Sequence, residues 1–114
     1  MKTELEGRTK RFAVQVVMTV GKFPRNAAGG VLGRQLLKAA TSIGANYREA
    51  NRAESKDDFI HKVGVSEKEA SETCYWLEIC EAAHIGPCEE IKSLLQESSE
   101  LLASLTTIGK NAKR

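Results

Sequence analysis

Apolar residues that recur every three or four positions constrain the fold of this chain more than any other feature. The clearest run lies between residues 31 and 54, where the stripe consists of Leu32, Leu36, Ala39, Ile43, Tyr47 and Ala50. This spacing follows the 3.6-residue turn of an α-helix and places the whole stripe on one face. The pattern therefore predicts an amphipathic helix that buries this face against other elements.

Three further segments repeat the pattern, and residues that start or stop helices bound them. Pro24 closes the first segment, because proline cannot continue a helix. Ser55 followed by Asp58 is a capping pattern that opens the next segment, and Gly86-Pro87 separates it from the last one. The four predicted helices cover residues 8–23, 31–54, 56–85 and 88–109, followed by a frayed basic tail.

The four amphipathic helices can hide their apolar stripes only against one another. Short connections make neighbouring helices antiparallel, and a chain of 114 residues is long enough to bury one continuous core. Aromatic residues make up only 5% of the chain, which disfavours sheet structure. We therefore predict a single all-α domain over residues 1–114, an antiparallel up-down-up-down four-helix bundle.

Composition also bears on location and redox chemistry. No run approaches the ~20 apolar residues that span a bilayer, and the N-terminus lacks the apolar region of an export signal. We therefore expect a cytoplasmic protein with no membrane partner and no cofactor. Cys74, Cys80 and Cys88 are odd in number and form no CxxC pair, so we expect free thiols that are buried or half-buried.

Charge is divided unevenly along the chain. Residues 1–56 carry 11 Lys and Arg against 4 Asp and Glu, whereas residues 57–114 carry 6 against 11. One explanation is a basic face for nucleic acid or a nucleoprotein. Another is charge complementarity between the two halves or between subunits, which needs no ligand. The residues predicted to contact nucleic acid are Arg8, Lys10, Arg11, Lys22, Arg25, Arg34 and Lys38, and Arg48, Arg52 and Lys56 belong to the same basic half.

Polar residues also follow helical spacing beside the apolar stripes. Ser42, Asn46 and Glu49 lie on one side of the second predicted helix. The third predicted helix carries a matching strip of Lys62, Ser66, Glu69, Thr73 and Trp76. We expect the two strips to meet inside the bundle and to form hydrogen bonds with each other, since buried polar groups are normally paired.

A metal or catalytic site is the alternative use of these carboxylates. Di-iron bundles combine inward Glu residues with two Glu-x-x-His pairs. Only Glu81 and His84 form such a pair here, at the end of the third predicted helix, so a site that included Glu49, Glu69 and Glu72 would lack its second half. We therefore predict no metal and no catalytic residue.

A more specific pattern lies in the centre of the chain. It reads AATSIGANYREA at residues 39–50, KEASET at residues 68–73 and WLE at residues 76–78. These segments resemble the bacterial four helix bundle protein family, over about residues 8–108. The family includes proteins encoded within intervening sequences of the large-subunit ribosomal RNA gene, and it is related to the accessory variability protein of diversity-generating retroelements.

The resemblance implies an up-down-up-down bundle and assembly into a ring-shaped homopentamer. For the retroelement relative, a basic surface is implicated in binding nucleic acid and a reverse transcriptase. The family has no established catalytic residues, so the resemblance implies none here. The family's recognisable polar positions are occupied by Ser42, Asn46, Glu49, Arg52, Glu69 and Glu72, and Ala50 stands where many members have Gly.

Aromatic residues are the candidates for an oligomer interface, because such residues are enriched there. They are Tyr47, Tyr75 and Trp76, of which Tyr75 is expected to point outward and Trp76 to lie at the edge of the core. The sequence thus predicts a non-enzymatic, homo-oligomeric bundle whose basic N-terminal half associates with nucleic acid or a nucleoprotein. A metal-binding or enzymatic bundle that uses inward Glu residues is the alternative.

Overall fold

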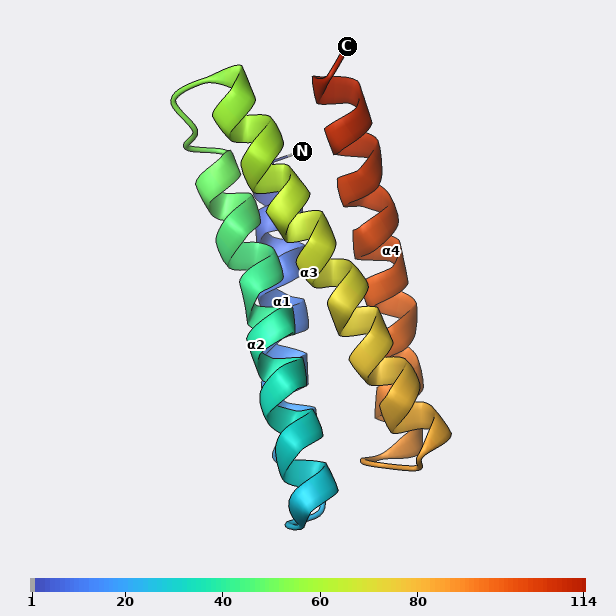
Figure 1. The fold of residues 1–114 in the computed structure, drawn as a ribbon. Coiled ribbons are helices and arrows are strands. Elements are labelled where there is room, and N and C mark those ends of the chain that lie inside the picture. Colours follow the sequence, from blue (N-terminus) through green and yellow to red (C-terminus); the bar gives the residue numbers. More distant parts are fainter. Residues whose placement is uncertain (1) are drawn as a thin grey trace.

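The structure is a computed structural model that describes residues 2–114. This range contains four helices (Figure 1). They are α1 (Lys2–Val20), α2 (Ala27–Ala50), α3 (Lys56–Ala82) and α4 (Cys88–Ala112). Each helix packs against the next one, and α1 also contacts α4, in a bundle of 44 × 19 × 19 Å. The predicted all-α, up-down-up-down arrangement is confirmed.

The N-terminal ends of two helices differ from the prediction. α1 begins at Lys2 rather than at residue 8, because Leu5 and Thr9 are buried and extend the inward face of the helix by more than a turn. α2 begins at Ala27 rather than at residue 31, because the side chain of Asn26 accepts a hydrogen bond of 2.8 Å from the Gly29 amide.

The C-terminal ends differ for local reasons as well. α1 ends at Val20, α2 at Ala50 and α3 at Ala82, all short of the predicted positions. At the end of α3 the backbone of His84 has a φ of 57°, outside the helical region. α4 continues to Ala112, so most of the tail that was predicted to fray is helical.

The predicted cap of α3 is confirmed, since the Ser55 hydroxyl accepts a hydrogen bond of 3.0 Å from the Asp58 amide. The core is formed by the predicted stripes. Its largest fully buried side chains include Leu36 and Ile43 from α2, Leu77 from α3, and Leu101 and Leu105 from α4. None of the helices in the described range is long and apolar enough to cross a membrane.

Small residues let the helices approach closely. On α3, the Ser66 hydroxyl is fully buried and donates a hydrogen bond of 2.7 Å to the Ile43 carbonyl of α2. Between α1 and α2, a Cβ atom at Gly44 would lie 2.9 Å from Oγ1 of Thr9, closer than real Cβ atoms pack. The position of α1 therefore requires a residue without a side chain at position 44.

Two glycine substitutions test this dependence. Gly44→Leu forces α1 away from α2, and we expect it to lower the free energy of unfolding by about 2 kcal/mol. The matched control is Gly64→Leu on α3, where nothing lies within 4 Å of the added Cβ. There we expect a gain of about 0.5–1 kcal/mol from helix propensity. Urea unfolding measures both, and equal effects of the two variants would contradict the close contact at Gly44.

Candidate nucleic-acid interface

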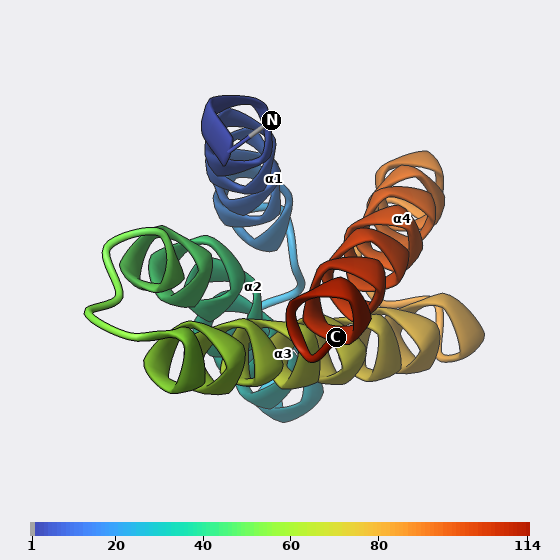
Figure 2. The same ribbon diagram turned by 90° about the horizontal axis from the view of Figure 1, so that it is seen from above.

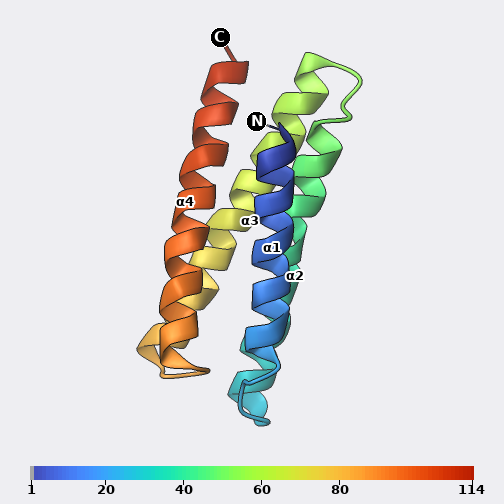
Figure 3. The same cartoon turned by 180° about the vertical axis from the view of Figure 1, so that it is seen from behind.

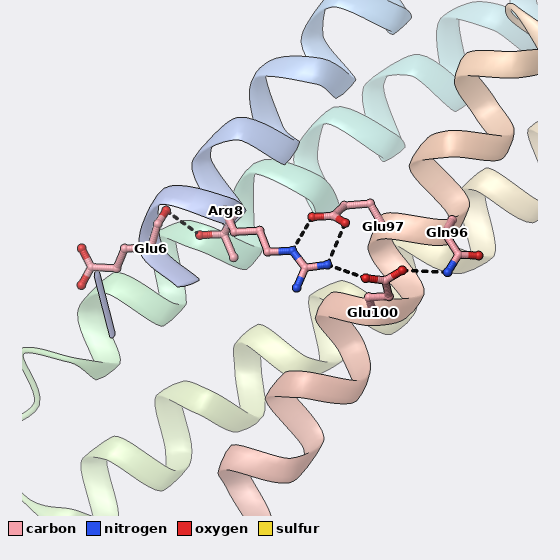
Figure 4. Close-up of polar contacts among 6 residues, drawn as sticks. Glu6, Arg8, Gln96, Glu97 and Glu100 are labelled. Carbon is pink, nitrogen blue, oxygen red and sulfur yellow. Dashed lines mark hydrogen bonds and ion pairs between the residues drawn. The ribbon is translucent and has the colours of Figure 1, made fainter. Parts of the chain in front are cut away.

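The basic residues of the N-terminal half fall into three groups, of which the first is bound within the bundle. Arg8 on α1 donates two hydrogen bonds to Glu97 of α4, of 2.6 and 2.8 Å, and a third of 2.7 Å to Glu100 (Figure 4). The paired donors match the two oxygens of the Glu97 carboxylate, a geometry that strengthens an ion pair. The hydrogen bonds that Arg8 donates to Glu97 raise the pKa of Arg8. The charge of Arg8 therefore joins the first helix to the last.

Lys22 has a similar role at the other end of α1. Its Nζ lies 2.7 Å from Glu90 of α4, and the Thr19 hydroxyl donates a hydrogen bond of 2.8 Å to the same carboxylate. The hydrogen bond from Lys22, and to a smaller extent the one from Thr19, holds the pKa of Glu90 below its ordinary value. Arg8 and Lys22, two of the seven residues predicted to contact nucleic acid, are thus engaged by acidic side chains of α4.

The second group forms a row along the outer face of α2. Its members, at spacings of four and three residues, are Arg34, Lys38, Thr41, Ala45, Arg48 and Arg52, and all are exposed. With a rise of 1.5 Å per residue, the part of the row that lies on α2, from Arg34 to Arg48, is about 21 Å long. Arg52 follows in the turn after the helix ends at Ala50. We call these six residues the α2 basic row. The row itself contains no acidic residue, although Glu6 and Glu49 line a shallow groove beside Arg48 and Arg52.

Within the α2 basic row the cations differ in their partners. Arg48 lies 3.4 Å from Glu6 of α1, and Arg52 donates a hydrogen bond of 3.3 Å to the Arg48 carbonyl. Across residues 2–114, neither Arg34 nor Lys38 has an acidic side chain within 4 Å. These two side chains are therefore the most available for an anion.

The remaining predicted cations are distributed around the molecule. Lys10 of α1 lines a shallow groove beside the α2 basic row, of about 460 Å³, together with Arg48 and Arg52. Arg11 lines a different groove, between α1 and α4, and Arg25 is exposed in the connection after α1. The structure therefore brings Lys10, but neither Arg11 nor Arg25, alongside this row. The four- and three-residue spacing from Arg34 to Arg52 is the sequence signal that identifies it.

The two predicted polar strips meet only in part. Lys62 of α3 donates a hydrogen bond of 2.7 Å to Glu49 of α2, and this contact lowers the pKa of Glu49 and raises the pKa of Lys62. Ser42 and Asn46 instead bond to carbonyls one turn earlier in α2, at 2.7 and 2.8 Å. The prediction that these two residues bond across to α3 is wrong, because the carbonyls of α2 itself offer nearer acceptors.

The carboxylates of the metal alternative are not gathered. Glu49 is paired with Lys62, Glu72 accepts a hydrogen bond of 3.3 Å from Trp76, and Glu81 and His84 are exposed. In residues 2–114 no group of three or more His, Cys, Asp or Glu side chains is placed to hold a metal ion. The described geometry therefore gives the metal alternative no support.

The aromatic candidates also separate. Tyr47 is only 3% exposed and belongs to the core, so its prediction as an interface residue is wrong within this chain. The apolar stripe of α2 continues through it toward the other helices. Tyr75 is 55% exposed, as expected, and packs edge-on against the half-buried Trp76 with ring centroids 5.2 Å apart.

The cysteines are free, as predicted, but they lie in different environments. Cys74 and Cys80 are buried, whereas Cys88 is exposed, so the expectation of burial is wrong there. Cys88 is the first residue of α4 and precedes the buried stripe that starts at Ile91. Burial raises the pKa of the Cys80 thiol, which makes that thiol a poor nucleophile.

Comparison with known families adds an evolutionary relationship to this geometry. The family model described as 23S rRNA-intervening sequence protein matches residues 2–107. The chain belongs to this family. The resemblance seen in residues 39–78 is therefore confirmed.

A solved structure supports the same assignment for this intervening-sequence family protein. It is a protein of unknown function from the S23 ribosomal protein family of Bacteroides thetaiotaomicron, 37% identical, with a TM-score of 0.86. The match covers 96% of this chain and 99% of that one. No curated protein matches the chain. The comparisons thus give the family and the fold, and the family has no known function.

Proposed function

We propose that this protein is a non-enzymatic homo-oligomer that associates with nucleic acid or a nucleoprotein through the α2 basic row. Three exposed cations on a line of about 21 Å along α2, followed by the exposed Arg52 in the turn beyond the helix, support the proposal. Such a row matches a phosphate backbone, whose charges are closely and regularly spaced. The family description, which refers to 23S ribosomal RNA, makes RNA the first probe.

The chemistry of the row also determines the kind of recognition. It contains no aromatic side chain on which a base would stack, and its cations are the long, exposed side chains of Arg and Lys. Contacts of this kind neutralise phosphates and carry little sequence information. Binding should therefore tolerate many sequences and weaken steeply as salt rises.

A paired substitution tests the row. We expect Arg34→Gln with Lys38→Gln to reduce the salt dependence of RNA duplex binding by about two phosphate contacts, with a slope change of about 0.9 for each. The matched control is Lys92→Gln with Lys110→Gln, which removes the same charge from exposed positions of α4. Binding isotherms at several salt concentrations measure the slopes. Equal slopes for both double variants would mean that net charge, and not the row, governs binding.

Self-association has separate support on the outer face of α1. Val14, Val17 and Met18 are 52%, 51% and 63% exposed, and they lie within little more than one turn of one another. α3, with the exposed Tyr75, lies on the opposite side of the bundle from α1 (Figure 2). We propose that the apolar face of α1 packs on the aromatic face of α3 in a second copy.

Charge favours the same pairing. Lys10 and Arg11 adjoin the apolar face of α1, whereas Glu72 and Glu78 adjoin Tyr75 on α3. Contact between two different faces is head-to-tail, and repetition of this contact closes a ring when the rotation between copies allows it. Five copies are the number that the family resemblance leads us to expect. This arrangement would account for part of the charge difference between the two halves of the sequence.

Light scattering with size-exclusion chromatography tests the assembly. We expect the unaltered chain to be an oligomer, and Val17→Gln with Met18→Gln to dissociate it while leaving helix content unchanged. Tyr75→Ala should have the same effect from the other side of the contact. Val31→Gln, at a 49% exposed position of α2, is the control and should leave the mass unchanged. A monomeric parent protein, or variants that all keep its mass, would refute this interface.

A further inference from the structure

A second groove lies away from the α2 basic row, between α1 and α4. These two helices stand apart on one side of the α2–α3 pair, as the views from above and from behind show (Figures 2 and 3). The groove has a volume of about 860 Å³ and is lined by the first part of α1, the last part of α4, and residues of α2 and α3 beneath them. This volume lies within the range of about 300–1,000 Å³ that is typical of small-molecule sites.

Each of the four helices contributes an apolar side chain to the groove. These are Leu5 of α1, Tyr47 of α2, Phe59 of α3 and Ile108 of α4. Leu5 and Tyr47 are largely buried, and Phe59 and Ile108 are half-buried. An apolar ligand in the groove would therefore remove the exposed parts of these side chains from water.

The charges at the groove are mostly positive. Lys2, Arg8 and Arg11 line it together with a single carboxylate, Glu4. Arg8 is neutralised by Glu97 and Glu100, which do not line the groove. Within the described chain, Arg11 and Lys2 have no acidic side chain in ion-pair distance. Arg11 therefore offers a free guanidinium beside an apolar surface.

We propose that this groove binds an amphiphilic carboxylate of fatty-acid size, with the chain on the apolar wall and the carboxylate on Arg11. The guanidinium presents paired donors that fit a carboxylate, and the wall suits a hydrocarbon chain. The α2 basic row has no part in this site, whereas Arg11 also adjoins the apolar face of α1 that we propose packs on a second copy.

Titration calorimetry with dodecanoate, below its micellar concentration, tests the site on the full chain. We expect one dodecanoate to bind per chain, and dodecanol, which lacks the charge, to bind more weakly. Ala103→Trp places a ring in the groove at an exposed position of α4, and we expect it to weaken dodecanoate binding at least about tenfold by steric exclusion. Thermal unfolding confirms that this variant is folded.

Two arginine variants test where the carboxylate binds. Arg11→Gln should weaken dodecanoate binding about threefold, as expected for an exposed ion pair, and leave dodecanol binding unchanged. Arg25→Gln, outside the groove, is the matched control and should change neither. The proposal is overturned if dodecanoate shows no saturable binding, if Ala103→Trp binds it normally, or if the two arginine variants behave alike. It is also overturned if Ala103→Trp lowers the oligomer mass, because a second copy would then occupy the groove.

Discussion

The ion pair of Arg8 with Glu97 and Glu100 joins the first helix to the last and takes the charge of Arg8 out of the set available to a partner. It connects α1 to α4 across 89 residues of sequence, and the Lys22–Glu90 pair repeats this connection near the other end of α1. Both pairs use cations of the basic half and carboxylates of the acidic half. The opposite charges of the two halves are therefore partly matched inside one chain. Arg34 and Lys38, on the outer face of α2, are among the cations that these pairs leave without an acidic partner in residues 2–114.

The architecture could be predicted because it depends on local periodicity. The apolar stripe from Leu32 to Ala50 predicts which face of α2 is buried, and that face is buried in the structure. The ends of the helices were harder to predict, since a single hydrogen bond, such as the one that the Asn26 side chain accepts from the Gly29 amide, moves a helix start by several residues. Apolar spacing also places Tyr47 correctly in the buried stripe, and only its added assignment to an interface failed.

The candidate site could be predicted in composition but not in detail. Basic residues were recognisable from the sequence, yet nothing local distinguishes Arg8 from Arg34. The difference arises because Arg8 faces the seam with α4, where Glu97 is within reach, whereas Arg34 points outward from α2. Which helix lies across a seam is a tertiary property. Ser42 and Asn46 likewise bond to carbonyls of their own helix, which the sequence did not predict. Residue spacing alone does not decide which of two neighbouring acceptors a side chain uses.

We propose that the outer face of α2, and not the basic half as a whole, meets a polyanion. Lysine acetylation with mass spectrometry, in the presence and absence of an RNA duplex, tests this directly because it measures each amine separately. We expect RNA to protect Lys38 and, beside the row, Lys10, while Lys22 and Lys62, which are held by Glu90 and Glu49, change little. Protection spread equally over Lys92, Lys110 and Lys38, or absent from Lys38, would contradict the account.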